Sequence, residues 1–304
     1  MATVLRRMAP GDVGEAVELW NADYVHDPVG PARLERIVFG DPHGDPDGRL
    51  AAVTGGALAG FVCCVAPSVA WMPPHAFLKG LCARSYGPGG AADDLLGAAE
   101  QFAARCGKEG VHVVEYAAAG YFFPGIPFEY PDKIDFFVRH GYRQGRELHD
   151  VDVDLGDFTP TAQQQAAFQK AAAEGIEILP YGPAMLDMMK GMVDALQMPY
   201  WFPPGWEAHY SSARNTFVAV QKGRMLGYAN YQPNAERGDF GTTAVLAELR
   251  GRGIGSCLLV ASMLRMKELG TPRVWAHWAN TPFYLKNGWR ICRRYATFHK
   301  PLAG

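Results

Sequence analysis

The residues with the clearest chemical potential are an arginine and three glycines between an apolar stretch and a helical one. Arg250, Gly251, Gly253 and Gly255 follow an apolar, β-branched run that ends at Leu246, and a helical pattern comes next. The first N–H groups of a helix have no partner within it, and glycine has no β-carbon to keep a ligand away. This spacing predicts a loop that offers N–H donors, and the positive end of a helix dipole, to an anion.

The spacing of these glycines excludes two common anion-binding loops. A G-x-G-x-x-G dinucleotide fingerprint starting at Gly251 or Gly253 would end on Ser256 or Leu258, and neither is glycine. The sequence also lacks a G-x-x-x-x-G-K-[ST] phosphate loop here. What remains is Arg250-x-x-Gly253-x-Gly255, a pattern that a plain connecting turn can also have.

A second candidate segment follows a strand-like run at Arg273–Ala279. It reads Asn280-Thr-Pro-Phe283-Tyr284-Leu-Lys286-Asn-Gly288-Trp289. The phenol of Tyr284 is a candidate proton donor. The alternative is that Phe283 and Tyr284 are ordinary core aromatics on a short helix.

Together the two segments resemble the GNAT superfamily of acyl-CoA-dependent N-acyltransferases. The first matches its pyrophosphate motif [RQ]-x-x-G-x-[GA], and the second matches N-x-x-[AP]-x-x-[FY]-Y-x-[KR]-x-G-[FW], shortened by about one residue. The resemblance implies acetyl-CoA as co-substrate, with Tyr284 protonating the departing thiolate and no metal. The residues it assigns to acyl-CoA binding are Val245, Leu246, Arg250, Gly251, Arg252, Gly253, Ile254, Gly255, Ser256, Asn280, Phe283 and Lys286.

The acceptor in such a reaction is an amine, which must lose a proton before it attacks. The carboxylates nearest in sequence to the expected strand are Glu236, Asp239 and Glu248, and a threonine hydroxyl on the strand could hold a relay water. Asp239 directly precedes the strand, so Asp239 and Tyr284 are the expected catalytic residues. Cys257 is discounted as a nucleophile because the family transfers the acyl group directly in a ternary complex.

The earlier half of the chain repeats both segments. Arg84-x-x-Gly87-x-Gly89 satisfies the loop pattern, and the run from Asp135 to Tyr142 aligns without a gap on the second segment. Phe137 stands where Tyr284 does, and Pro88 removes one N–H donor from the loop. We therefore expect a degenerate first domain and a catalytic second one. A bulky residue at Gly253 should abolish acyl transfer, whereas one at Gly87 should mainly affect folding.

The duplication predicts two tandem GNAT-like domains of an α/β (α+β mixed sheet) class. Each is expected to have a mostly antiparallel central sheet flanked by helices, with a splayed pair of parallel strands at the acyl-CoA groove. The expected boundaries are 1–157 for the first domain, 158–175 for a helical linker and 176–304 for the second. Residues 147–155 alternate strictly and are expected to close the first domain. Two aromatic segments, 121–131 and 198–206, are either pocket walls or ordinary packing.

Composition narrows the remaining possibilities. A chain of 304 residues with a net charge of −2 has no electrostatic footprint for nucleic acid or an anionic membrane. Six cysteines without a C-x-x-C pair favour a reducing compartment and no metal site. We therefore expect a cytoplasmic N-acetyltransferase, an acyltransferase of groups other than amino-acyl groups, acting on a small-molecule amine and possible as an oligomer. The alternative is a non-catalytic pseudo-enzyme that senses acyl-CoA or a metabolite.

Overall fold

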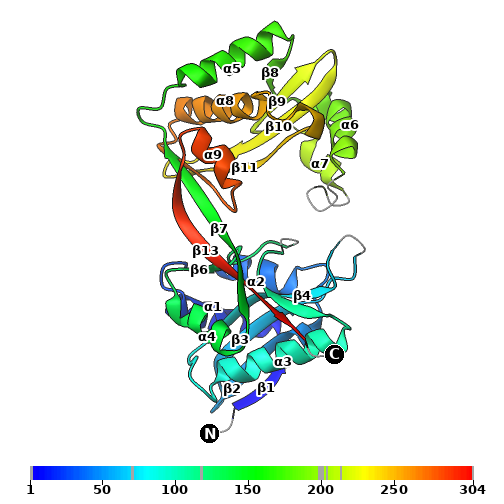
Figure 1. The fold of residues 1–304 in the computed structure, drawn as a ribbon. Coiled ribbons are helices and arrows are strands. Elements are labelled where there is room, and N and C mark those ends of the chain that lie inside the picture. The colour runs from blue at the N-terminus through cyan, green and yellow to red at the C-terminus, as the bar shows by residue number, and fades with distance from the viewer. Residues whose placement is uncertain are drawn as a thin grey trace. The chain divides into compact units, whose positions relative to one another are not determined.

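The computed structural model describes residues 3–69, 72–116, 119–197, 202, 205–212 and 214–302. The chain divides into two compact units, one made of Met1–Leu148 with Arg294–Gly304 and the other of His149–Arg293. Each unit has a mixed sheet with helices packed on both of its faces (Figure 1). The expected fold class and the expected duplication are confirmed. No helix in the described part of the chain is long and apolar enough to cross a membrane.

The first unit holds the elements β1 (Thr3–Arg7), α1 (Val13–Asp23), α2 (Pro31–Phe39), β2 (Arg49–Thr54), β3 (Ala57–Val65), β4 (His75–Ala83), α3 (Ala91–Arg105), β5 (Gly110–Val113), β6 (Ile126–Pro127), α4 (Pro131–Arg139) and the start of β7 (Arg143–Asp154). Its strand order is β1-β2-β3-β4-β5-β13-β7, where β13 is Arg290–Pro301. The pair β4–β5 is parallel, and the pairs β1–β2, β2–β3, β3–β4, β5–β13 and β6–β13 are antiparallel.

Two neighbouring residues of β3 show how the helices cover this sheet. Successive side chains of a strand point to opposite faces. Phe61 packs against Trp20 of α1, with ring centroids 6.2 Å apart. Val62 lies in the other core cluster, together with Leu95 of α3 and Phe136 of α4. The first unit is therefore a three-layer sandwich of helix, sheet and helix.

The second unit holds the end of β7 and the elements α5 (Ala162–Ala173), β8 (Glu177–Pro180), α6 (Leu186–Leu196), α7 (Trp206–Tyr210), β9 (Thr216–Gln221), β10 (Arg224–Gln232), β11 (Gly238–Val245), α8 (Ile254–Glu268), β12 (Arg273–Ala276), α9 (Thr281–Lys286) and the start of β13. Short 3₁₀ turns complete the two units at Pro10–Asp12, Pro46–Gly48, Pro183–Met185 and Ala247–Leu249. The strand order β7-β12-β11-β10-β9-β8 has β11–β12 as its parallel pair.

Neighbouring residues of β10 show the same layering in the second unit. Tyr228 belongs to the cluster with Met189 and Met192 of α6, so these methionines pack in the core. Ala229 belongs to the cluster with Leu258 of α8. In Figure 1, α5 and α8 lie on the same side of this sheet, as their contacts require.

The residue ranges of the two units differ from the expected domain boundaries. Residues 151–154 of β7 pair with β12 in the second unit, although the alternation of 147–155 suggested a strand that closes the first. Conversely, residues 298–301 of β13 pair with β5 in the first unit. The expected linker helix also belongs to the second unit, since Lys267 Nζ of α8 donates to the carbonyl of Phe158 at 2.9 Å. Alternation fixes which face a side chain takes but not which sheet a strand joins.

Candidate active site

The glycine loop before α8 has the geometry of an anion site. Gly251 and Gly253 have φ of +79° and +91°, which glycine adopts without strain. Gly253 is the N-cap of α8. The first helical N–H that donates to its carbonyl is that of Cys257. The N–H groups of residues 254–256 are therefore the unpartnered donors of a helix start. No side chain caps this helix and its first turn has no acidic residue, so its positive end is open to an anion.

The other residues expected at this loop surround it. The guanidinium of Arg250 donates to the carbonyl of Val245 at 3.3 Å, and Arg252 is paired with Glu174. Phe283 of α9 closes over Gly255: a β-carbon built there would lie 3.3 Å from its ring. Lys286 is exposed in the last turn of α9, whereas Asn280 is that helix's N-cap. Ile254 contributes its backbone here and its side chain to the core, and Ser256 is half-buried.

A gap opens beside β11 because β12 pairs with it only briefly. The parallel register joins Gly238 to Val274 and Asp239 to Trp275, after which β12 ends. The chain then turns toward β7, where the N–H of Ala279 donates to the carbonyl of His149 at 2.8 Å. From residue 240 onward β11 is paired on its β10 side alone in the described structure. This is the expected splayed pair of parallel strands.

Backbone pairing decides which N–H groups of β11 face this gap. The N–H of Leu246 donates to the carbonyl of Leu226 at 3.0 Å, so it is not available to a substrate. Hydrogen-bonding directions alternate along an antiparallel strand. The N–H of Val245 therefore points away from β10 and toward the gap. The carbonyl of Val245 points the same way and accepts the hydrogen bond from Arg250. Of Val245 and Leu246, both expected at the acyl-CoA site, Val245 therefore directs its N–H to the gap and Leu246 does not.

Tyr284 lies in an aromatic cluster with Phe240, the residue of β11 that directly follows its pairing with β12. Its ring centroid is 6.0 Å from that of Phe240, 5.0 Å from Trp289 and 5.1 Å from Phe283. The side chain is 7% exposed, and burial raises the pKa of its phenol well above the usual value. At neutral pH the hydroxyl is therefore protonated and can donate. Tyr284 is both a core aromatic and a usable acid.

Asp239 lies at the point where β11 and β12 separate, next to a histidine that the sequence did not single out. Its Oδ1 is 3.5 Å from His277 Nε2 and 3.8 Å from Arg237 Nη2. On the other side His277 Nδ1 lies 2.8 Å from Oδ2 of the buried Asp150. Burial opposes the charged ring, but the hydrogen bonds and charges of Asp150 and Asp239 outweigh it and raise the pKa of His277 to about 9.

The histidine is therefore an imidazolium at neutral pH, held between two carboxylates. It cannot act as a base there, but it holds Asp239 in place and offsets its charge. No local sequence signal marks it: His277 follows the end of β12, and the register that pairs Trp275 with Asp239 brings it close.

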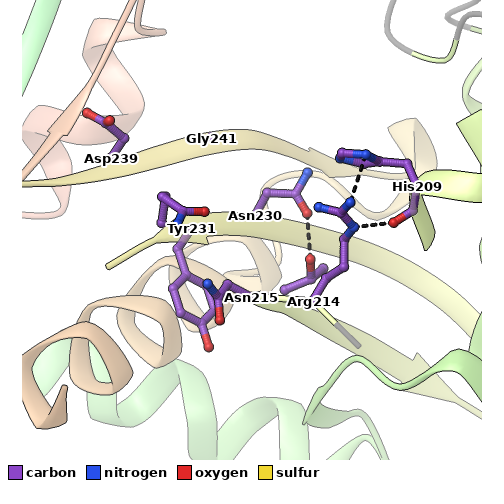
Figure 2. A pocket seen from close by; sticks show the side chains of 9 residues that line it. His209, Arg214, Asn215, Asn230, Tyr231, Asp239 and Gly241 are labelled. Carbon is purple, nitrogen blue, oxygen red and sulfur yellow. Dashed lines mark hydrogen bonds between the residues drawn. The ribbon is translucent and has the colours of Figure 1, made fainter. Parts of the chain in front are cut away.

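A cavity of about 320 Å³ lies beside Asp239. Its walls come from the start of β9, the end of β10 and the start of β11, and its lining residues are His209, Arg214, Asn215, Thr216, Asn230, Tyr231, Gln232, Asp239 and Gly241. Figure 2 shows Asp239 at one end and Arg214, which contacts the ring of His209 at 2.8 Å, at the other. The cavity thus presents an anion and a cation at opposite ends. Of the expected aromatic floor, 198–201, 203 and 204 lie outside the described residues, and Phe202 packs on Trp206.

The equivalent loop in the first unit is closed by its own side chain. The N–H of Gly89 donates to the carboxylate of Asp93 at 2.6 Å, and Asp94 adds a second acidic residue to the first turn of α3. The Asp93 carboxylate accepts a loop N–H that a bound anion would otherwise accept, and the charges of both residues offset the positive end of the helix dipole. Gly87 has no left-handed φ, and a β-carbon built there would have Ser85 Oγ, at 3.6 Å, as its one neighbour within 4 Å. Alanine therefore fits at this position, and the folding defect expected for a bulky residue stays a prediction.

The region beyond the parallel pair of the first unit is filled as well. Leu78 of β4 is the last residue paired with β5, and a β-carbon at Gly80 would lie 2.9 Å from the ring of Phe122. Phe122 stacks on Trp20 at 4.1 Å between centroids. This part of the aromatic 121–131 insert is therefore packing. Phe137 is also buried, and its ring centroid is 5.8 Å from that of Phe298.

Comparison with known proteins agrees with this geometry. Residues 212–291 match the acetyltransferase (GNAT) domain family, a range that includes the glycine loop, both strands at the gap and Tyr284. No curated protein matches the sequence.

Solved structures resemble both units together. A glucosamine N-acetyltransferase region, GCN5-related, from a fungal multi-domain GH3 β-N-acetylglucosaminidase has a TM-score of 0.78 at 19% identity, over 98% of this chain and 38% of that one. A GCN5-related N-acetyltransferase from Sphaerobacter thermophilus has a TM-score of 0.69 at 18% identity, over 99% and 96% of the chains. A tandem GNAT protein from the clavulanic acid biosynthesis pathway has a TM-score of 0.69 at 16% identity. The match covers 100% of this chain and 99% of that one. At these identities the likeness shows a shared fold.

Proposed function

We propose that this protein, in which residues 212–291 belong to the acetyltransferase (GNAT) domain family and the whole chain has a tandem GNAT fold, transfers an acetyl group from acetyl-CoA to a primary amine. The second unit carries the reaction. The observation that supports this most is the open, uncapped start of α8 beside a gap between parallel strands, with Tyr284 packed against Phe240 where that gap begins.

Acetyl-CoA binds by two sets of backbone groups. The pyrophosphate takes the N–H groups of residues 254–256. The exposed guanidinium of Arg250 precedes them in the chain, and the exposed ammonium of Lys286 is on α9, whose Phe283 packs against Gly255. The pantetheine arm follows the unpaired edge of β11 as an added strand would. The acyl carbonyl then meets the N–H of Val245, which stabilises the tetrahedral oxyanion; loss of such a donor costs about 10²- to 10³-fold in rate.

The amine attacks the thioester carbon from the side of the cavity. The nitrogen forms the amide bond as the carbon–sulfur bond breaks, and at that stage it loses its second proton to solvent. Before the attack, the incoming ammonium must lose its first proton. Asp239 accepts this proton, either directly or through a water held by the hydroxyl of Thr243, which has no partner among the described residues. Tyr284 supplies a proton to the departing thiolate, and solvent restores both groups. The His277 imidazolium keeps Asp239 oriented.

The charges at the two ends of the cavity favour one class of acceptor. Asp239 attracts the ammonium of the incoming amine, and Arg214 at the other end suits an anionic or strongly polar group on the same molecule. The acceptor is therefore a small polar amine such as an amino acid or an amino sugar. A cavity of this volume is at the lower end of the range for small-molecule sites.

A covalent acyl-cysteine route has little support. Cys257 is buried in the first turns of α8, and burial raises the pKa of its thiol to about 11. Because the thiolate is the nucleophile, this residue is inert at neutral pH. Direct transfer within a ternary complex fits the site better.

The test measures release of free coenzyme A thiol from acetyl-CoA with a panel of amino acids, amino sugars and polyamines. We expect turnover with at least one polar amine, and a large loss of kcat in Asp239→Asn. Glu248→Gln is the matched control, because Glu248 is an exposed carboxylate paired with Arg224 and should leave the rate unchanged. Acetyl-CoA binding with no turnover on any amine would favour the sensor alternative, and absence of acetyl-CoA binding would reject the proposal.

A further inference from the structure

Three histidines from three neighbouring strands meet in the first unit. His75 is on β4, His112 on β5 and His299 on β13. The register sets His299 directly opposite His112, while β4 runs parallel to β5 and brings His75 to the same place. One ring nitrogen from each residue lies within 4.8 Å of the others. No short sequence motif could have shown this, because the three positions are far apart in the chain.

Two of these rings have buried nitrogens without a hydrogen-bond partner. They are Nδ1 of His75 and Nε2 of His299. Buried polar atoms in native proteins are nearly always paired, so two unpaired nitrogens in one cluster require an explanation. Both face the same point: a β-carbon built on Gly110 would lie 2.6 Å from His299 Nε2 and 3.2 Å from His75 Nδ1. The missing side chain of Gly110 therefore leaves room where the two lone pairs converge.

The protonation state of the cluster also suits a ligand role. Burial and the two neighbouring rings lower the pKa of His112 to about 4, and burial together with His75 lowers that of His299. Neutral imidazole is the form that binds a metal ion. The three rings are tilted against one another, with interplanar angles of 37° to 58° and centroids 4.5 to 5.0 Å apart.

We propose that His75, His112 and His299 form a binding site for a divalent transition-metal ion of the zinc class, centred above Gly110. A regular triangle with edges of 4.8 Å has its centre about 2.8 Å from each corner, against roughly 2.0–2.1 Å for a Zn–N bond. Ring movements of less than about 1 Å close that difference. Three imidazoles suit zinc, copper or nickel better than magnesium or calcium, which prefer oxygen ligands.

The position of the site gives the ion a structural role. His299 is on a strand from the C-terminal end of the chain, and the other two ligands are on strands from its N-terminal half. The ion therefore fastens β13 to β4 and β5 and stabilises the first unit. It takes no part in the acetyl transfer proposed for the second unit, and it does not depend on that proposal.

The experiment uses the full chain, freed of metal by a chelator and then dialysed. Titration with Zn²⁺ by calorimetry, and with Co²⁺ by its visible absorption, should show one site per chain and a rise in the thermal unfolding temperature. His112→Ala and His299→Ala should each weaken Zn²⁺ binding by at least about 100-fold, since even loss of a group behind a ligand costs 10- to 100-fold. Gly110→Ala keeps every ligand but fills the space, and should weaken binding too.

His26→Ala is the matched control, because His26 is an exposed histidine of the same unit outside the cluster. It should bind Zn²⁺ as the parent chain does. Circular dichroism of each metal-free variant checks that it is folded. Failure of the parent chain to bind Zn²⁺ below about 100 µM overturns the proposal. So does equal binding by His112→Ala and the control, since the ion would then lie elsewhere.

Discussion

Replacing Gly253 by alanine tests the anion loop at its most constrained residue. The φ of +91° places this residue in the left-handed region, where a β-carbon costs about 1–2 kcal/mol. The new methyl group would also lie 3.2 Å from the Cβ of Ala167 on α5, which must move by a few tenths of an ångström. Alanine also lowers the conformational entropy of the unfolded chain, which raises the free energy of unfolding by about 0.4–1 kcal/mol. The net loss of stability is therefore about 1 kcal/mol, a fall of roughly 2–4 °C in Tm for a unit of this size.

The free energy of acetyl-CoA binding should fall by more than the free energy of unfolding does. The strain is relieved if the peptide at 253–254 rotates, which turns one N–H away from the pyrophosphate. A hydrogen bond to a charged group is worth about 1.5–3 kcal/mol, so the Kd for acetyl-CoA should rise about 10- to 150-fold. Calorimetric titration with acetyl-CoA measures this directly, and thermal unfolding without ligand measures the stability term.

Gly87→Ala in the first unit is the control for this experiment. Gly87 stands in the same loop pattern but has no left-handed φ and no atom nearer than 3.6 Å to its built β-carbon. Its Kd for acetyl-CoA should stay within about twofold of the parent chain. An unchanged Kd in Gly253→Ala, or an equal rise in both variants, would refute the assignment of the loop before α8 as the pyrophosphate site.

Three further changes test the remaining parts of the structure. Tyr284→Phe keeps the ring packing and removes the acid, so kcat should fall about 10²-fold with the acetyl-CoA Kd nearly unchanged; an unaltered kcat would remove Tyr284 from the mechanism. The pKa of His277 is raised from 6.5 to about 9 on folding, so its ion pairs stabilise fully below pH 6.5 and are lost as pH rises through 9. The Tm difference between the parent chain and His277→Gln should therefore shrink from pH 6 to pH 9.5, and a constant difference would argue against the pairing. Asp93→Ala removes the carboxylate that caps Gly89, so the first unit should lose about 1 kcal/mol while acetyl-CoA stoichiometry stays at one; a second bound acetyl-CoA would show that Asp93 alone closes that loop.

Local patterns in the sequence predicted the elements of the second unit well. Glycines at 251, 253 and 255 and the helical spacing after them led to the loop and α8, and the apolar run before them led to β11. These features depend on residues close in sequence, whose conformational preferences act locally. The same reasoning identified Phe137 as the counterpart of Tyr284, and both side chains are buried.

Features that depend on distant pairing could not be predicted in this way. The role of His277 rests on a strand register, and the availability of Val245 rather than Leu246 rests on hydrogen bonds to β10. Asp93 is an ordinary acidic residue at a helix start until its contact with Gly89 is known. The histidine cluster joins three strands that no local pattern connects.

The exchange of strands between the units has a consequence for synthesis of the chain on the ribosome. The first unit needs residues 298–301 to cover the edge of β5, but these are made roughly 150 residues after Leu148. At about 5–20 residues per second, that edge waits on the order of ten to thirty seconds without its partner strand. An unpaired edge is a template for wrong pairing during that interval. Translation speed and chaperone supply should therefore govern the yield of this protein more than its final stability does.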